Sequence, residues 1–565
     1  MIDTGSTGFM LVCAMLVLLM TPGLAFFYGG LSRRKNVVNT MVMVFGVLGI
    51  VGVMWVVCGW SFAYGGDGSL PFFGGLDQIG CLSAVNDMVA EAEGTPDAFA
   101  VLSGQGALAN DPELAAGYPA IIDIVFQMAF AMITCAIITG AVAGRMKFGA
   151  VCAFVAVWVV VVYAPLAHMV WGGDGSLIGD MIGALDFAGG DVVHISSGLT
   201  GLILCLMLGR RKGFAVLSYR PHNVPFVALG AALLWFGWFG FNAGSEFAAD
   251  GVAGLALLNT VAASAAGVLS WMITERITVG KCTLVGAATG LVAGLVAITP
   301  AAGFVEPWAA IVMGLIVSPI VYAAISQAKR RLGYDDALDA FGCHCVGGIV
   351  GGILTGLFCV PGLSWTEHGG LLYTGDWSLL GSQVLGILVT IAFVAIADVV
   401  LGLIIKACFK GSLRVSAEDE AAGLDVAVHG ESAYPAYRGL DEHGGAIEKG
   451  VAAMKRVTAI VRPEKMEPLK DALFAADVKG MTISQVHGCG AQHGWSEYVR
   501  GTEVMLNMVP KVKFEVVVED DAVDALVDTI VGAARTGEVG DGKIFVAPVE
   551  EVVRIRTGER GATAV

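Results

Sequence analysis

Long apolar segments alternate with short polar connections over the first 405 residues of the chain. Such runs can be read at 8–29, 37–63, 121–143, 149–171, 192–209, 224–243, 252–274, 283–299, 308–327, 341–360 and 379–405. A helix needs about 20 apolar residues to cross the hydrocarbon core of a bilayer. The pattern therefore predicts eleven membrane-spanning helices, in an all-α polytopic membrane domain over residues 1–410.

The pattern changes after residue 410. Residues 411–453 are largely polar and rich in glycine and acidic residues, and we expect a tail and linker there. Over residues 454–559 the pattern predicts strands at 457–461, 481–487, 513–519, 543–549 and 552–556 and helices at 464–477 and 520–534. The βαββαβ order indicates an α+β ferredoxin-like domain with its helices on one face of the sheet. Residues 488–510 lack periodicity, and a loop of that length is usually functional or disordered.

The positions of the basic residues support the number of spans. All 17 Lys and Arg up to residue 414 lie in alternate connections, whereas the connection 64–119 carries eight acidic residues and no basic one. Because cytoplasmic loops collect Lys and Arg, we expect a multi-pass protein of the cytoplasmic membrane. Its N-terminus would lie outside, and the chain after residue 406 would lie in the cytoplasm.

Composition excludes other classes of protein. The chain is 56% hydrophobic and only 15% charged, against about 25% charged in soluble domains. The net charge of −16 gives no support to nucleic-acid binding. Most of the 12 cysteines lie in apolar runs, so no disulfide framework is indicated. Cys343 and Cys345 flank His344, but residues i and i+2 diverge on a helix, so we favour packing over metal binding.

Two histidines stand in apolar surroundings. GDVVHISSG (190–198) contains His194 and FGCHCVGG (341–348) contains His344, and each histidine follows an aspartate, Asp186 or Asp336, by eight residues. A buried interhelical hydrogen bond is one explanation, but ionisable groups at membrane depth more often mark a substrate or proton path. The histidines fall on the fifth and tenth spans, so we predict an inverted 5+5 repeat plus one span. Matching elements of such halves meet near the midplane, and the two histidines are expected to face each other.

Four motifs then identify the family. WGGDGSLIGDMIGALDFAGGDVVHISSG, FQMAFAMITCAIITGAVAGRM, RPHNVPFVALGAALLWFGWFGFNAGS and DDALDAFGCHCVGG closely resemble the ammonium transporter (Amt/Mep/Rh) family, bacterial Amt branch, over about residues 5–434. The resemblance implies a homotrimer with one pore per subunit and no catalytic cofactor. The resemblance assigns Phe130 and Phe241 to a stacked gate, and Trp171 and Ser245 to an outer recognition site with Trp238 nearby. Asp186 would be the structural and coupling carboxylate, and His194 and His344 would be the pore pair. For Asp186, a helix cap is an equally good explanation.

The chemistry of ammonium suits these residues. Aromatic faces offset part of the cost of dehydrating the cation, and neutral imidazoles beyond them can accept or relay its proton while ammonia follows an apolar path. K⁺ has no proton to give up. The sequence departs from the family pattern at Asp191 and Cys345, and these departures leave the rate and the ion selectivity of transport open. Glu246, beside Ser245, is expected to alter ammonium capture.

The C-terminal motifs MKRVTAIVRPEKMEPLKDAL, YVRGTEV and TGEVGDGKIFVAPVEEVVRIRTGE resemble the trimeric PII signal-transduction proteins. The resemblance implies binding of ATP or ADP, of Mg²⁺ and of 2-oxoglutarate as regulatory ligands. The nucleotide residues would be Thr482, Gln492, Gly540, Asp541, Gly542, Lys543, Arg554 and Arg556, with Gln492 also holding Mg²⁺ in the ATP state. Gln492 and Lys511 would contact 2-oxoglutarate. Residues 488–510 would be the T-loop, whose Arg500 resembles the arginine that plugs Amt pores. Val504 replaces the uridylylated tyrosine, and Ala491 and His493 replace basic residues near the phosphates.

Two functions remain open at this point. The first is ammonium transport controlled by the fused PII domain through nucleotide and 2-oxoglutarate. The second is an ammonium sensor that conducts little and signals through its PII domain to downstream proteins. We do not expect an enzyme, because no constellation of nucleophile and base is evident.

Overall fold

A computed structural model describes residues 3–66, 70–81, 118–211, 214, 220–434, 454–488, 496–499, 502–505 and 509–564. The chain separates into two compact units, one containing the apolar helices and the other the C-terminal sheet. They are described in turn.

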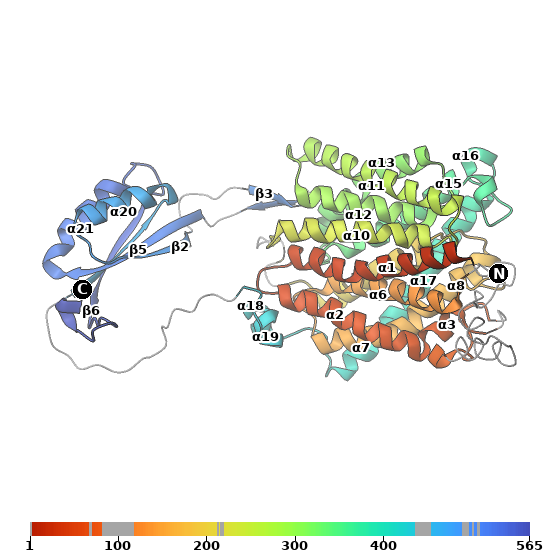
Figure 1. Cartoon of the computed structure of the whole chain (residues 1–565), viewed down its shortest axis with the longest axis horizontal. Coiled ribbons are helices and arrows are strands. Elements are labelled where there is room, and N and C mark those ends of the chain that lie inside the picture. Colours follow the sequence, from red (N-terminus) through yellow and green to blue (C-terminus); the bar gives the residue numbers. More distant parts are fainter. Residues whose placement is uncertain are drawn as a thin grey trace. The chain divides into compact units, whose positions relative to one another are not determined.

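Eleven helical segments among the described residues are long and apolar enough to cross a membrane, which confirms the predicted number. They are α1 (Thr4–Leu31), α2 to α3 (Val37–Met54, η1 Trp55–Gly59, Trp60–Tyr64), α6 (Ala120–Val142), α7 to α8 (Phe148–Trp158, η3 Val159–Tyr163, Ala164–Trp171), η5 and α9 (Gly190–Ile195, Ser196–Leu208), α10 (Val224–Gly244), α11 (Gly251–Thr278), α12 and η6 (Leu284–Ile298, Thr299–Ala301), α13 to α14 (Pro307–Ala323, η7 Ala324–Ala328, Lys329–Leu332), η8 and α15 (Phe341–Cys345, Val346–Phe358) and α17 (Ser378–Cys408). The long helices form a bundle in which they run roughly side by side (Figure 1). Short helices in the connections are η2 (Ile79–Cys81), η4 (Leu177–Met181), η9 (Pro361–Leu363) and α16 (Leu371–Thr374).

The first helices of the two halves, α1 and α10, pack against each other in opposite directions. The end of α1 meets the start of α10, where Asn223 N donates to Gly30 O at 3.2 Å, and the start of α1 meets the segment after α10, where Ala249 N donates to Ser6 Oγ at 3.3 Å. Gly230 permits the close contact, since a Cβ there would lie 2.2 Å from Phe27 N. This antiparallel pairing is the arrangement that an inverted repeat requires.

The connections at the end of the bundle where α1 finishes are tied together by a buried ion cluster. Arg211 Nη2 lies 2.5 Å and Arg145 Nη1 lies 3.6 Å from the Asp335 carboxylate, and the side chains of Arg145 and Asp335 are wholly buried. The cluster therefore joins three connections, those before α7, after α9 and before η8.

The tail folds back onto the same end of the bundle through α18 (Ala417–Ala422) and α19 (Leu424–His429). The Asp425 carboxylate accepts a hydrogen bond from Asn39 N at 2.8 Å, and Leu424 N donates to Asn36 Oδ1 at 3.0 Å. The tail is thus part of the membrane unit as far as Tyr434, whose hydroxyl lies 3.2 Å from His222 Nε2.

The C-terminal unit is an antiparallel sheet in the order β2-β5-β1-β6. Its elements are β1 (Met454–Val461), η10 (Pro463–Lys465), α20 (Met466–Ala475), β2 (Thr482–Gly488), β5 (Val509–Glu519), η11 (Asp520–Ala522), α21 (Val523–Ala534), β6 (Gly542–Val549) and η12 (Gly561–Ala564), and β3 (Ser496–Val499) and β4 (Thr502–Met505) form a separate pair. Both helices cover one face of the sheet (Figure 1) and enclose a core that includes Val457, Leu469, Leu473, Phe514 and Ile530. The ferredoxin-like prediction is confirmed.

The prediction of a last strand at 552–556 is wrong. Only an isolated bridge forms, between Val553 and Arg560. The segment turns back on itself because Arg554 N donates to Glu559 O at 2.9 Å, and Ile555 is fully exposed. Alternating residues predicted a strand, but this segment has no neighbouring strand to join in the described part of the sheet.

Candidate functional site

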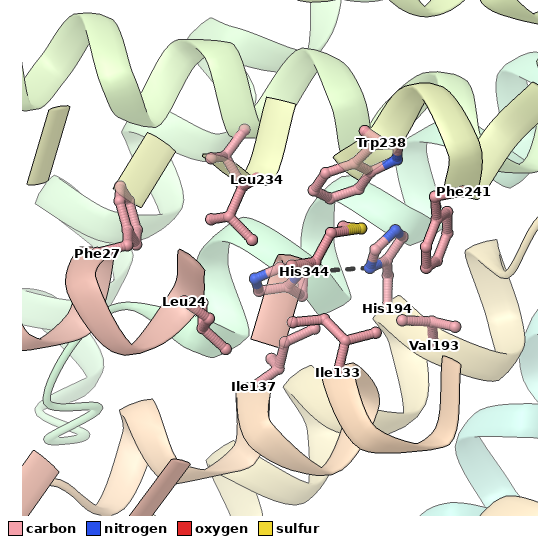
Figure 2. Close-up of a pocket in the computed structure, with 12 residues that line it drawn as sticks. Leu24, Phe27, Ile133, Ile137, Val193, His194, Leu234, Trp238, Phe241 and His344 are labelled. Carbon is pink, nitrogen blue, oxygen red and sulfur yellow. Dashed lines mark hydrogen bonds between the residues drawn. The ribbon is translucent and has the colours of Figure 1, made fainter. Parts of the chain in front are cut away.

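His194 and His344 face each other in the interior of the helical bundle (Figure 2). Their Nδ1 atoms lie 3.3 Å apart, and the two residues are 1% and 5% exposed. Each histidine belongs to one π-helical turn at the start of its span, η5 or η8. The expectation that the two histidines face each other is therefore met.

Paired glycines bring the two segments together. A Cβ on Gly198 would lie 2.4 Å from Cys345 N, and a Cβ on Gly348 would lie 2.9 Å from Gly190 O and 3.2 Å from His194 Cβ. Gly198 and Gly348 each follow a histidine by four residues, so each half supplies a glycine against which the other half packs. Small residues allow such close helix contacts in membranes.

Asp186 caps the fifth span. Its carboxylate accepts hydrogen bonds from the backbone N–H groups of Gly189 (2.8 Å), Gly190 (2.6 Å) and Asp191 (2.8 Å). Asp336 does the same for the tenth span, accepting from Phe341 N at 2.8 Å. Both aspartates therefore satisfy the N–H groups that a helix start leaves without partners, and any coupling role of Asp186 stays a prediction.

The imidazoles border a narrow cavity of about 10 Å³, close to the minimum of ~10–15 Å³ that one water molecule needs. Its walls come from α1, α6, η5, α10, α12 and η8 and are otherwise apolar or aromatic: Met20, Leu24, Phe27, Ile133, Ile137, Val193, Leu234, Trp238, Phe241 and Val292, with the two histidines. Figure 2 shows Phe241 and Trp238 beside His194, and Leu24 and Phe27 farther along, beyond His344. So small a space excludes a hydrated ion.

Aromatic rings continue this line beyond His194. The Phe241 ring stacks on that of Phe130 with centroids 4.0 Å apart and an angle of 16°, and it lies 6.2 Å from the His194 ring. Trp171 meets Phe130 edge-on at 6.2 Å, and its Nε1 donates to Asp186 O at 2.8 Å. Ser245, whose hydroxyl donates to Phe241 O at 2.9 Å, lies on the segment that follows α10. The structure thus brings the predicted aromatic residues and the histidines into one row.

Thr299 contacts the candidate site and was missed by the sequence reasoning. Its hydroxyl oxygen accepts a hydrogen bond from Trp238 Nε1 at 3.0 Å and lies 3.4 Å from His194 Nε2. The Trp238 and His194 rings are stacked with centroids 5.4 Å apart. A signal was present, since Thr299 and Pro300 end the otherwise apolar run LVAGLVAI.

Glu246 lies half-buried next to Ser245, outside the spanning segments. Burial, together with the charge of Asp250 and a hydrogen bond to it, raises the pKa of Glu246 to about 7. The Asp250 carboxylate also caps α11, accepting from Val252 N at 2.9 Å. A carboxyl group beside the predicted recognition serine therefore changes charge near neutral pH.

The unusual residues Asp191 and Cys345 are both buried, and neither lines the cavity. Cys345 packs against Gly198. Among the residues that the structure describes, no three His, Cys, Asp or Glu side chains are grouped so that they could hold a metal ion.

In the C-terminal unit, Asp541 organises the loop before β6. Its carboxylate accepts from Thr536 N at 2.7 Å, Gly537 N at 2.8 Å and Arg462 Nε at 3.1 Å, and the bonds from Thr536 hold the pKa of Asp541 well below its ordinary value. Gly542 has a φ of +117°, and a Cβ there would lie 1.7 Å from Ile460 O, so only glycine fits.

The other predicted nucleotide and effector residues are dispersed within one chain. Lys511 Nζ donates to Gly540 O, and Lys543 is the second residue of β6, where it pairs with Ile460 of β1. Thr482, the first residue of β2, pairs with Glu515 of β5, whereas Lys511 of β5 pairs with Val486, closer to the end of β2. Arg554 and Arg556 belong to the turn after β6, where Arg554 Nη1 lies 2.5 Å from the Glu559 carboxylate. Gln492 and Arg500 lie outside the described residues.

Known proteins resemble both parts of the chain. Residues 8–434 match the family model described as the Ammonium Transporter Family, and residues 454–559 match that described as Nitrogen regulatory protein P-II. The chain is 47% identical over 434 residues to an ammonium transporter of Aquifex aeolicus, covering 77% of this chain and 94% of the relative, and 46% identical over 431 residues to one of Bacillus subtilis, covering 76% and 98%. Among solved structures it resembles Saccharomyces cerevisiae Mep2, with a TM-score of 0.63 at 32% identity over 74% of this chain and 88% of that one. It also resembles a protein titled Sensor Amt Protein, with a TM-score of 0.64 at 28% identity over 75% and 98%.

Proposed function

Because this chain belongs to the ammonium transporter family and carries a C-terminal PII domain, we propose that it conducts ammonium through the cavity that His194 and His344 border. The observation that carries this proposal is the continuous row of Trp171, Phe130, Phe241 and the two facing imidazoles. Ammonium would bind at the aromatic end, where Trp171 and Ser245 offer a ring and a hydroxyl oxygen.

The narrow apolar cavity favours ammonia over its cation. An ion that leaves water for a medium of low dielectric loses of order 20 kcal/mol of hydration in the idealised limit, and cation–π attraction restores only part of this. A proton acceptor inside the cavity removes the charge, so that ammonia passes and the proton follows through the imidazoles. K⁺ cannot lose its charge in this way and is rejected.

The fused PII domain would regulate this pathway. We propose that this domain binds ATP or ADP, Mg²⁺ and 2-oxoglutarate, and that Arg500 of the T-loop blocks the pore in one ligand state. We also propose that the chain forms a homotrimer in the cytoplasmic membrane, with its N-terminus outside and the PII domain in the cytoplasm. The proposed borders are 1–410 for the membrane-spanning domain, 411–453 for the cytoplasmic tail and linker, and 454–559 for the PII domain. A tethered domain has an effective concentration on the order of mM, so ligands act by shifting conformations rather than by releasing the domain.

A second candidate function is ammonium sensing with little conduction. It is favoured by Asp191 and Cys345, which depart from the transporter pattern, and by Glu246, a carboxyl group beside the predicted recognition serine. The similarity to a protein titled Sensor Amt Protein also favours it. In that case the PII domain would report ammonium binding to other proteins.

One experiment separates the two functions. Ammonium-evoked current is recorded from the full-length protein in a planar membrane and from a version that ends at Tyr434, with and without ATP, ADP and 2-oxoglutarate. Current that these ligands change only in the full-length protein supports regulated transport. If neither version passes current while both bind ammonium, the protein is a sensor.

The role of the histidines has its own test. The double variant His194→Ala with His344→Ala is expected to lose ammonium selectivity or ammonium current. An unchanged ammonium current with K⁺ still rejected would contradict the proposed role of the pair, and the same recordings from the parent protein are the control.

A further inference from the structure

Thr299 occupies a point where three hydrogen-bonding groups of different elements meet. Its hydroxyl lies 2.8 Å from Leu295 O on α12, 3.0 Å from Trp238 Nε1 on α10 and 3.4 Å from His194 Nε2 on η5. The side chain is wholly buried. A hydroxyl group has one proton and two lone pairs, so these three contacts can be assigned by counting.

The two shorter contacts settle the hydroxyl's direction. The Trp238 indole N–H can only donate and a backbone carbonyl can only accept, so the Thr299 oxygen accepts from Trp238 and its proton goes to Leu295 O. The second lone pair of the oxygen then faces His194. This contact is favourable only when His194 carries a proton on Nε2.

The assignment extends to the second imidazole. A neutral imidazole with its proton on Nε2 has its lone pair on Nδ1, and Nδ1 of His194 lies 3.3 Å from Nδ1 of His344. His344 must therefore donate from Nδ1, which leaves the lone pair of its ring on Nε2. The pair is polarised: His344 donates to His194, which donates to Thr299.

The backbone holds Thr299 at this point. Pro300 O accepts from Phe187 N at 3.2 Å, and the Pro300 ring packs on Gly190, where a Cβ would lie 2.7 Å from Pro300 Cβ. The end of α12 is thus fixed against the turn that carries His194. On the opposite side of the pair the cavity continues between Leu24, Phe27 and Ile137, which carry no polar side-chain atom (Figure 2).

We propose that Thr299 is a positioning residue that sets the tautomers of the histidine pair, so that Nε2 of His344 accepts the proton that ammonium gives up. This inference rests on the proposed conduction through the pair. His194 lies nearer to Phe241 and meets ammonium first. In this tautomer, however, Nε2 of His194 already carries a proton, so ammonium loses its proton to His344 instead.

The variants Thr299→Val and Thr299→Ser test the proposal. Valine keeps the shape and removes the oxygen, whereas serine keeps the oxygen. General acid–base contributions are typically 10²–10⁴-fold, and we expect Thr299→Val to lower the maximal ammonium current by about tenfold or more. The half-saturating ammonium concentration should change by less than about twofold, because the aromatic entrance is untouched, and Thr299→Ser should restore the current. Thr355→Val is the matched control, since Thr355 makes the same bond to a carbonyl four residues earlier, to Gly351 O at 2.9 Å.

A spectroscopic measurement keeps the test independent of conduction. The nine histidines of the full-length protein are labelled with ¹⁵N in lipid bilayers, and the His194 signals are assigned by their loss in His194→Gln. We expect a protonated Nε2 in the parent protein, in Thr299→Ser and in Trp238→Phe, and a shift toward the other tautomer in Thr299→Val. A proton on Nδ1 of His194 in the parent protein, or an unchanged spectrum in Thr299→Val, would overturn the proposal. If the parent passes no current, the conduction proposal fails, while the spectra still decide the role of Thr299.

Discussion

At the scale of single residues, the candidate pore depends on two imidazoles that lie among apolar and aromatic side chains. His194, His344 and Asp186 stand out in the sequence because polar groups are rare in apolar runs. Thr299 did not, because buried threonines commonly bond back to a carbonyl four residues earlier, and its contacts with Trp238 and His194 join three elements distant in sequence. The sequence places Glu246 beside Ser245, but the shifted pKa of Glu246 depends on burial and on Asp250.

Glu246 gives a prediction about pH. Its pKa of about 7 is raised above that of a free carboxyl group, so the side chain is mostly neutral at pH 6 and mostly charged at pH 8. A negative charge beside Ser245 attracts a cation. The half-saturating ammonium concentration should therefore fall as the pH rises from 6 to 8, and in Glu246→Gln this dependence should be lost.

Current recordings at several ammonium concentrations and at both pH values measure this effect. The Glu306→Gln variant is a suitable control, because the pKa of Glu306 is lowered by hydrogen bonds from Trp308 and Tyr373, so Glu306 stays charged over this range. The same pH dependence in the parent protein and in Glu246→Gln would show that another group is responsible.

At the scale of elements, the spacing of aspartate and histidine predicted the inverted halves, and the structure adds the reason why they fit. Gly198 and Gly348 each follow a histidine by four residues, and the other half of the repeat packs closely against each of them. The wrongly predicted strand at 552–556 shows the limit of such patterns. Alternation indicates that a segment suits a sheet, whereas a strand also needs a neighbouring strand, and Val553 pairs with Arg560 in an isolated bridge.

The buried cluster of Arg145, Arg211 and Asp335 gives a prediction about stability. Removing one member of a buried ion pair typically costs about 3–5 kcal/mol, because the remaining charge is left uncompensated. We expect Asp335→Asn to lower the midpoint of thermal unfolding in detergent. Asp339→Asn is the matched control: Asp339 pairs with Lys329 at 2.6 Å in a more exposed position, and its φ of +67° suits asparagine.

The pH dependence of this effect has a definite sign. Burial raises the pKa of Asp335, but the charge of Arg211 and its hydrogen bonds, together with Arg145, hold it below the ordinary value. A carboxyl group whose pKa is lowered in the folded state stabilises that state. This contribution is fully present above about pH 4, the pKa of the unfolded group, and is lost as the pH falls through the pKa of the folded state. The difference between the parent and Asp335→Asn should thus be constant at neutral pH and shrink in acid. A constant difference down to pH 3 would contradict the assigned charge.

At the scale of the whole molecule, the chain combines two units with separate cores. The membrane unit is stabilised by helix packing and by the buried Asp335 cluster, and the PII unit by one layer of helices on a sheet. Both units could be predicted from composition and periodicity, since each core is built from contiguous sequence. The residues of the proposed nucleotide site could not be assembled in the same way: Thr482 and Lys511 lie apart on β2 and β5 of a single chain.

Separate cores predict separate unfolding. Mg²⁺ with ATP at 100 times its dissociation constant would stabilise the unit that binds it by about 2.7 kcal/mol, which for a domain of about 100 residues corresponds to a shift on the order of 10 °C. In calorimetry of the full-length protein we expect two transitions, of which nucleotide moves only the one due to the PII unit and Asp335→Asn moves only the other. The version that ends at Tyr434 identifies the membrane transition, because it lacks the PII unit and should not respond to nucleotide. A single transition that both changes move would mean that the units unfold as one. Regulation would then act through a shared core rather than through ligand-dependent contacts between independent parts.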